Sequence, residues 1–349
     1  MDKLKIGFIG TGKKQKPSSR GYAMAYRHAD GYASLEPCEM VACADIAPEN
    51  GEAFAETYGI RKTYLDYHDM LEKEDLDMVS ICVWPHLHAQ MTIDCAEAGV
   101  RAIHCEKPMA SNWADSKRMA QVCEDRGVQL TFNHQRRFAR PFQQARKLLI
   151  VGEIGELTRL EGEIGNIYDG GTHFIDLFGF FNEESPGEWV IGQADCRSEN
   201  RAFGALVENF GVFYWQYQNG VHALMVSGQG NLGIGAANRL IGTEGVIEVG
   251  VKGGSALRIK REGTWEDIDC DGEGIHGAHF IGRALEDTVD ALQAGHEPEL
   301  SARKALNTTE IIFAAYESCR RRIRIDLPLD EIPDNPLESL FDEGVYSAD

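Results

Sequence analysis

A histidine with two nearby carboxylates, in the stretch NIYDGGTHFIDLF, is the first candidate for chemistry. Asp169 precedes His173 by four residues, and Asp176 lies one turn after it on the same face of a helix expected to begin near Thr172. An imidazole titrates near neutral pH and so suits proton transfer, and the Asp169 carboxylate could hold its tautomer. A purely structural contact would give the same pattern. No further His or Cys lies at ligand spacing nearby, so the stretch does not favour a metal site.

A glycine-rich turn follows the first apolar run, LKIGFIG. Gly10, Thr11 and Gly12 would let the backbone turn sharply and approach a pyrophosphate at the start of a helix. The third glycine of a GxGxxG pattern is missing, because Gln15 takes its place and eight residues, rather than two, separate Gly12 from Gly21. We infer an insertion of six residues that enlarges the phosphate loop.

The enlarged loop is basic in an otherwise acidic protein. Its cationic residues are Lys13, Lys14, Lys16 and Arg20. They could contact a phosphate through charge complementarity, or they could form a solvated basic loop. Both interpretations stay open.

Two further charged residues end predicted strands. Asp45 closes EMVACAD, where a carboxylate can accept both ribose hydroxyls of an adenosine but would repel a 2′-phosphate. Asp45 therefore favours NAD over NADP, although an Asp that caps the following helix would look the same. Lys107 follows VRAIHCE, at the sheet edge where doubly wound sheets bind ligands, and its ammonium would favour a developing alkoxide. Taken alone, an exposed loop lysine is the simpler interpretation of Lys107.

The composition excludes several classes of partner. The 349 residues carry a net charge of −20, from 55 acidic and 35 basic side chains, which would repel a phosphate backbone or an anionic membrane. We therefore expect no nucleic-acid partner and no membrane association. No uncharged apolar run reaches the ~20 residues that span a bilayer, and the strand at Leu4 leaves no room for a signal peptide. Nine cysteines without a CxxC pair are typical of buried residues in a reducing cytoplasm.

Residues 1–133 alternate short β-branched runs with amphipathic stretches that end in glycine. This alternation predicts stacked βαβ units and a doubly wound parallel sheet, so the domain is of the α/β class. The expected strands are LKIGFIG, EMVACAD, DMVSICVW, VRAIHCE and VQLTFN.

Residues 134–349 predict a second domain of the α+β class. A helix-like segment, RPFQQARKLLIVG, is followed by longer alternating strands with tight glycine turns, which favour a mainly antiparallel sheet. Two helical stretches follow, one within HFIGRALEDTVDALQAG and one within ARKALNTTEIIFAAYESCRRR. The Pro-rich, acidic tail from Asp326 is expected to wrap the surface or fray.

Several of these motifs together resemble one family. GFIGTG followed by Asp45, then HLHAQ, AGVRAIHCEKP, NHQRRF and DGGTHFID in that order, is similar to the glucose-fructose oxidoreductase and inositol dehydrogenase family (Gfo/Idh/MocA), from Leu4 to about Leu329. The resemblance implies a Rossmann domain that binds NAD(P) and a second domain with an open-faced, mainly antiparallel sheet. It also implies a homodimer or homotetramer that associates through the face of this sheet.

The family's functional residues carry over onto matching positions. Lys107 would be the catalytic lysine of the EKP motif, and Asp169 and His173 would be the Asp and His of DxGxH. These three, with Gln135 and Arg136, would also bind the substrate. The cofactor would be lined by Gly10, Thr11, Gly12, Lys13, Asp45, Trp84, His88, Glu106 and Lys107.

Two departures from the family pattern affect the expected contacts. The phosphate loop is enlarged, and VWPHLH replaces the more usual TPNHLH, which puts Trp84 where a proline is typical. The Trp84 indole could stack beside the nicotinamide or a sugar face, or it could only pack against its own helix.

The second domain offers further candidates for the substrate. Trp215 and Tyr217 share one face of a strand and could form an aromatic platform for a sugar, although sheet aromatics are usually core. Arg136, Arg137 and Arg140 could hold a carboxylate.

The resemblance implies an NAD-dependent oxidoreductase that transfers hydride between the nicotinamide and a secondary carbinol or ketone of a sugar, polyol or sugar derivative. Either His173 or Lys107 could act as the base. A redox glycosidase that retains NAD would share the same residues, and a non-catalytic dinucleotide-binding sensor is a further alternative. A sensor would have little reason to retain Lys107, Asp169 and His173 together.

Overall fold

The computed structural model describes residues 3–13, 23–230 and 232–342. The chain divides into two compact units, which we call the amino-terminal and carboxy-terminal units. The amino-terminal unit is formed by Met1–Ala110, Asp115–Gln135 and Ala278–Ala305. The carboxy-terminal unit is formed by Ser111–Ala114, Arg136–Gly277 and Leu306–Asp349.

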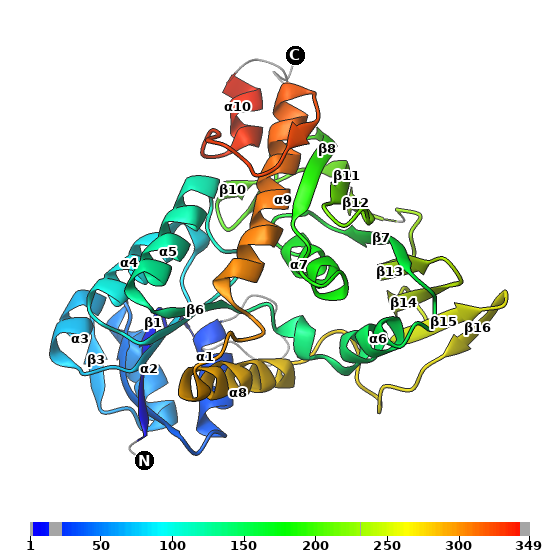
Figure 1. The fold of residues 1–349 in the computed structure, drawn as a ribbon. Helices are drawn as coiled ribbons and strands as arrows, with labels where there is room; N and C mark the ends of the chain where they lie inside the picture. The colour runs from blue at the N-terminus through cyan, green and yellow to red at the C-terminus, as the bar shows by residue number, and fades with distance from the viewer. Residues whose placement is uncertain (1–2, 14–22, 231, 343–349) are drawn as a thin grey trace. The chain divides into compact units, whose positions relative to one another are not determined.

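The amino-terminal unit is built on a parallel sheet, which has six strands in the described part of the chain (Figure 1). The strands are β1 (Leu4–Ile9), β2 (Cys38–Ala44), β3 (Lys62–Tyr64), β4 (Met78–Ile81), β5 (Ala102–Cys105) and β6 (Gln129–Phe132). Their order is β3-β2-β1-β4-β5-β6, and each neighbouring pair is parallel. This is the predicted doubly wound sheet, with the direction of winding reversed beside β1. The carboxyl ends of all these strands therefore meet at one edge.

Helices connect the strands of this unit, and their ends follow from local sequence signals. Pro48 and Pro85 lie in the first turns of their helices, where proline costs no hydrogen bond, and Gly59 ends a helix with a φ of 70°. The helices are α1 (Met24–Ala33), α2 (Pro48–Tyr58), α3 (Tyr67–Lys73), α4 (Pro85–Glu97), α5 (Trp113–Arg126) and α8 (His279–Ala294).

Helix α8 belongs to the amino-terminal unit, although the sequence analysis assigned its residues to the second domain. Its buried face, with Ile281, Leu285 and Val289, joins the apolar core beneath the sheet. Gly31 of α1 permits this packing, because a Cβ there would lie 2.6 Å from Leu285 Cδ1. The amphipathic pattern of α8 identifies a face that must be buried but not the surface that buries it.

The carboxy-terminal unit contains a mixed sheet, nine-stranded in the described residues, that is antiparallel except where β12 pairs with β7 (Figure 1). Its strand order is β16-β15-β14-β13-β7-β12-β11-β8-β17. The strands are β7 (Leu157–Ile164), β8 (Gly187–Asp195), β11 (Phe210–Tyr217), β12 (His222–Gly228), β13 (Ala236–Gly242), β14 (Gly245–Val251), β15 (Leu257–Arg261), β16 (Thr264–Asp267) and β17 (Ile325–Asp326). A separate hairpin pairs β9 (Arg201–Ala202) with β10 (Ala205–Leu206).

One face of this sheet is packed against helices and the other retains exposed apolar side chains. Along β11 the residues alternate, so that Phe213 and Trp215 are buried while Phe210 and Val212 are 46% and 41% exposed. Ile191 on the neighbouring β8 is also 46% exposed. The helical elements of the unit are η1 (Gln135–Phe138), α6 (Arg140–Ile150), α7 (Gly171–Phe181), α9 (Ala302–Arg321) and α10 (Pro336–Asp342).

The second unit differs from the sequence-based expectations at strand β11 and in the tail. Trp215 and Tyr217 are 0% and 1% exposed, so the substrate-platform hypothesis is wrong and both rings belong to the core. The tail contains a helix, α10, which we did not predict; Leu337 and Leu340 are completely buried, and this burial holds the tail against the unit. Within the described residues no helix is both long and apolar enough to cross a membrane.

Candidate cofactor and active site

The glycine turn after β1 has the backbone conformation that close approach to a ligand requires. Gly10 and Gly12 have φ angles of 81° and 61°, which residues with a Cβ rarely adopt. A Cβ at Gly10 would also lie 2.4 Å from Val83 Cγ1. Lys13 is exposed, whereas Lys14, Lys16 and Arg20 of the proposed phosphate loop lie outside the described residues.

Asp45 fixes this turn from the end of β2. Its Oδ2 accepts hydrogen bonds from Thr11 Oγ1 (2.9 Å) and Gly12 N (2.8 Å), while its Oδ1 accepts one from Ala47 N (2.9 Å). Ala47 is the N-cap residue of α2, and α2 has no side-chain cap hydrogen bond, so Asp45 holds the turn before the helix and does not cap it. A carboxylate has roughly four acceptor sites, which leaves capacity for a ribose hydroxyl. The next side chain, Ile46, is apolar and 93% exposed.

Lys107 lies two residues after the end of β5, at the same edge of the sheet as Gly10 and Asp45. The residue before it, Glu106, is 5% exposed and is held by a buried polar network. Glu106 Oε1 accepts hydrogen bonds from His28 Nε2 (2.9 Å) and Asn133 Nδ2 (2.7 Å). Glu106 Oε2 lies 3.2 Å from the backbone N–H of Lys107, which donates to it.

The charge of Glu106 is set by competition within this network. Burial raises its pKa, but the hydrogen bonds from His28 and Asn133, together with the charges of His28 and Lys107, lower it to about 2. Burial, reinforced by His28, lowers the pKa of the adjacent His104 to about 3. Glu106 is therefore a buried anion at neutral pH, directly beside the lysine predicted to be catalytic.

Trp84 and His88 occupy very different environments at the start of α4. Trp84 is 57% exposed at the position before the helix, so its indole is accessible to a ligand. His88 is completely buried, with Nε2 3.1 Å from Val83 O and Nδ1 3.0 Å from Pro108 O. Burial lowers the pKa of His88. Its contacts tie α4 to the segment after Lys107, and a contact of His88 with the cofactor stays a prediction.

The carboxy-terminal unit positions Asp169 and His173 around the start of α7. His173 lies in the first turn of the helix, as predicted, and is 5% exposed. Asp169 lies in the turn before it, where its backbone N–H donates to Asn166 Oδ1 (2.7 Å). The same turn is anchored by Glu208, a buried carboxyl whose Oε1 accepts a hydrogen bond from Ile167 N (2.7 Å).

The other predicted residues of this region have distinct roles. Asp176 forms a buried ion pair with Arg137, at 2.7 Å from Nε. Arg136 lies beside Phe174, with its guanidinium carbon 4.5 Å from the ring centre, and near the Asp169 carboxylate, which raises its pKa against the stronger effect of burial. Gln135 has a buried side-chain oxygen without a hydrogen-bond partner in the described part of the chain.

The structure thus gathers Gly10, Asp45, Trp84 and Lys107 at one edge of the first sheet, and Arg136, Asp169 and His173 in the second unit. The sequence analysis missed His28, Asn133 and Glu208. Asn133 could have been found as the polar residue that ends the apolar strand VQLTF. His28 and Glu208 carry no comparable local signal, because their partners are distant in sequence.

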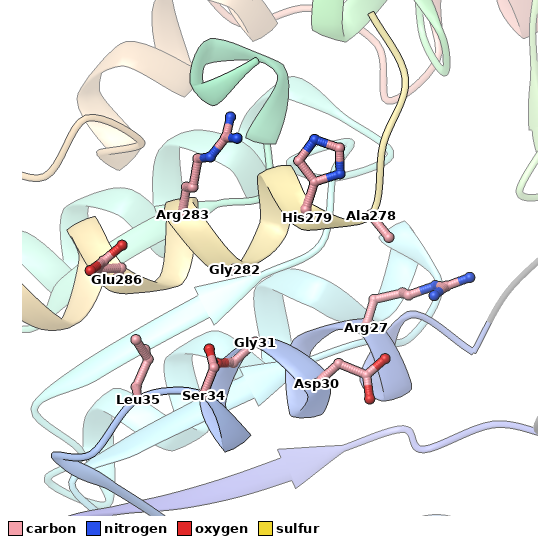
Figure 2. A pocket seen from close by; sticks show the side chains of 10 residues that line it. All are labelled: Arg27, Asp30, Gly31, Ser34, Leu35, Ala278, His279, Gly282, Arg283 and Glu286. Carbon is pink, nitrogen blue, oxygen red and sulfur yellow. The ribbon is translucent and has the colours of Figure 1, made fainter. Parts of the chain in front are cut away.

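A groove of about 430 Å³ lies between α1 and α8 of the amino-terminal unit (Figure 2). Its walls carry charges of both signs, with Arg27 and Asp30 on α1 and Arg283 and Glu286 on α8. Its lining residues include none of those predicted for the site.

Comparison with known proteins supports the interpretation of the first unit. Residues 4–134 match the sequence model of a family described as an oxidoreductase family with an NAD-binding Rossmann fold. Myo-inositol 2-dehydrogenase of Thermotoga maritima is 28% identical over 153 residues, which cover 44% of this chain and 42% of the relative. D-apiose dehydrogenase of Paraburkholderia graminis is 35% identical over 137 residues, which cover 39% of this chain and 35% of the relative. The chain thus spans less than half the length of these curated relatives.

Solved structures extend the similarity of fold to almost the whole chain. An oxidoreductase from Agrobacterium radiobacter, solved with NAD+, L-tartaric acid and magnesium, has a TM-score of 0.77 at 20% identity, covering 93% of this chain and 98% of the other. Aldose-aldose oxidoreductase from Caulobacter crescentus has a TM-score of 0.75 at 20% identity, covering 93% and 100%. These similarities confirm the predicted two-part fold.

Proposed function

Because residues 4–134 match the sequence model of the Gfo/Idh/MocA family of NAD-binding oxidoreductases, we propose that this protein is an NAD-dependent dehydrogenase of a sugar, polyol or sugar derivative. It interconverts a secondary carbinol and a ketone. The observation that carries the proposal is that Lys107 lies at the same sheet edge as the Gly10 turn and Asp45. The names of the relatives, myo-inositol 2-dehydrogenase and D-apiose dehydrogenase, support the class of substrate.

The residues at this edge fit a dinucleotide. The backbone from Gly10 to Gly12 would accommodate a pyrophosphate, Lys13 would add a positive charge, and Asp45 would accept a ribose hydroxyl. The exposed side chains of Ile46 and Trp84 would offer apolar contacts to the rings of the cofactor. The Asp45 carboxylate disfavours the extra phosphate of NADP. NAD, when bound, supplies the acceptor or donor of hydride.

The proton is handled by the protein's own side chains. We assign proton transfer at the substrate hydroxyl to His173, orientation of its imidazole to Asp169, and stabilisation of the developing alkoxide to Lys107. The base role could instead fall to Lys107, with His173 as the hydrogen-bond donor. Glu106, Gln135 and Arg136 complete the proposed cofactor and substrate contacts.

The second sheet supports a proposal about assembly and compartment. Its exposed apolar side chains, Ile191, Phe210 and Val212, would be covered in a homodimer or homotetramer formed through this face. All nine cysteines are free and eight of them are buried, which fits a reducing, cytoplasmic environment.

The direct test is a screen of sugars, polyols and sugar acids that follows NADH absorbance with NAD and NADP in parallel. We expect turnover with NAD and weaker turnover with NADP. His173→Ala should lower the rate by roughly two to four orders of magnitude while NAD binding, measured by calorimetry, stays nearly unchanged. His296→Ala, which alters an exposed histidine in a loop, is the matched control and should keep full activity. Turnover by His173→Ala at the wild-type rate would remove this residue from the mechanism.

A further inference from the structure

Two arginines lie in η1 and a third follows it, and two of the three are paired with carboxylates. Arg137 is buried and binds Asp176 through Nε (2.7 Å) and Nη2 (2.8 Å), and it also pairs with Glu184. Arg140 pairs with Asp271, and its backbone N–H donates to Glu273 (2.6 Å). Both guanidinium groups are therefore already paired with carboxylates of the chain.

Arg136 differs from both of these neighbours. Its Nη1 is buried and has no hydrogen-bond partner within the described residues. Among the described residues, no carboxylate lies within ion-pair distance of its guanidinium. The guanidinium carbon lies 4.5 Å from the centre of the Phe174 ring, and Nη2 lies 3.4 Å from His276 Nδ1. The Arg136 side chain as a whole is only partly buried, but a solvent-inaccessible guanidinium nitrogen without a hydrogen-bond partner is unusual, because buried polar atoms are normally hydrogen-bonded.

The surroundings of Arg136 connect it with the proposed active site. Phe174, on which the guanidinium stacks, directly follows His173 in α7. His276 has a pKa lowered by desolvation and by the Arg136 charge, so its imidazole stays neutral near neutral pH. When its Nδ1 accepts a hydrogen bond from Arg136, the proton of the neutral imidazole is on Nε2, which becomes a second donor.

We propose that Arg136, assisted by His276, binds a carboxylate of the substrate, so that the enzyme acts on a sugar acid rather than on a neutral sugar. The inference rests on the proposed function and narrows its substrate class. One guanidinium matches the two oxygens of a carboxylate. A phosphate ester carries more charge than this one cation balances, and the nearby Asp169 carboxylate adds repulsion.

The test compares three matched probes: galacturonate, galactose and galactose 6-phosphate. The full-length protein is assayed with NAD, and binding of each probe to the protein without NAD is measured by calorimetry. We expect galacturonate to have the highest kcat/KM and to bind, with both neutral and phosphorylated probes at least about tenfold poorer. The same comparison is repeated with glucuronate and glucose, which differ from galacturonate and galactose in the configuration of one ring carbon.

Variants of Arg136 separate charge recognition from structure. Arg136→Met should raise KM for the acid by about 10- to 100-fold, with a much smaller change in kcat and in the KM of the neutral sugar. Arg136→Lys keeps the positive charge but loses the paired N–H donors of the guanidinium, so it should restore only part of the affinity for the acid. Arg118→Met, which removes an exposed arginine of α5, is the control and should leave both substrates unaffected.

The possible results separate this inference from the proposed function. Equal turnover of acid and neutral sugars, a preference for the phosphate ester, or an Arg136→Met effect equal on all probes would overturn the carboxylate site but leave the dehydrogenase intact. Carboxylate binding that depends on Arg136, without reduction of NAD by any probe, would support the site and contradict the dehydrogenase.

Discussion

Glu106 in the amino-terminal unit and Glu208 in the carboxy-terminal unit are 5% and 0% exposed, yet their pKa values shift in opposite directions. Burial acts to raise both. For Glu106 the hydrogen bonds and charge of its neighbours, led by His28, overcome burial and lower the pKa to about 2. For Glu208 burial dominates and the pKa is raised, because the hydrogen bonds that oppose burial, from Ser227, Tyr316 and the Ile167 N–H, come from neutral groups.

The difference shows that hydrogen bonds alone do not keep a buried carboxyl ionised. Glu208 accepts short bonds of 2.6 Å from Tyr316 Oη and 2.7 Å from Ile167 N, comparable with the 2.9 and 2.7 Å bonds of Glu106. What distinguishes Glu106 is that its hydrogen bond to His28 and its charge interactions with His28 and Lys107 lower its pKa, whereas no charged group lowers the pKa of Glu208. Three substitutions test this contrast.

The largest effect is expected from Glu106→Gln. The amide keeps the size of the side chain but removes its charge, and its NH₂ group would face the Lys107 N–H, which is also a donor. The free energy of unfolding should fall by about 3 kcal/mol at neutral pH, as measured by urea denaturation.

The pH dependence of this loss provides its control. The stability from ionised Glu106 is present above its ordinary pKa of 4.5 and is lost as the pH falls toward about 2. The gap between wild type and Glu106→Gln should therefore close over this range. A gap that stays constant on acidification would mean that shape, not charge, explains the effect.

An intermediate effect is expected from Tyr316→Phe. This change removes the 2.6 Å hydrogen bond to Glu208 and leaves a buried carboxyl oxygen without that donor. Unfolding free energy should fall by about 1.5 kcal/mol. NMR titration of the Glu208 carboxyl should show its pKa rising further, and an unchanged pKa would show that Tyr316 does not stabilise the anion.

The smallest effect is expected from Glu208→Gln. The amide oxygen can accept from Ile167 N, while the NH₂ group donates to the Tyr316 hydroxyl, which can also act as an acceptor. The change in stability at neutral pH should stay below about 1 kcal/mol. A raised pKa means that ionised Glu208 is unfavourable in the folded state. The stability of the wild type should therefore increase relative to that of Glu208→Gln as the pH falls and Glu208 becomes protonated. A loss of unfolding free energy as large as that expected for Glu106→Gln would contradict the proposed difference between the two buried carboxyls.

The sequence predicted the parts of the site that depend on strand ends. Gly10, Asp45 and Lys107 each follow a predicted strand of a parallel sheet, and topology alone brings such positions to one edge. The helix start at His173 was also predictable, because the apolar run FIDLFGFF follows two glycines. The three-residue strand β3 was too short to give a signal.

Partners distant in the chain could not be predicted. His28 and Glu106 are separated by 78 residues, and nothing near either one indicates the other. Arg136 and Arg137 are adjacent in the same motif, yet one is saturated by carboxylates and the other is not. Trp215 and Tyr217 had the alternation of a half-exposed strand, and only the packing of the unit shows that their face is the covered one.

Residues 278–305 pack in the first unit although they are far from it in sequence, so the nucleotide-binding half cannot be isolated as one continuous fragment. An excised fragment that stops at Gln135 would leave Phe8, Tyr32 and Phe54 in a core stripped of three aliphatic side chains from α8. Any transplant of this half into another scaffold therefore has to carry that distant helix with it, as one of three discontinuous pieces.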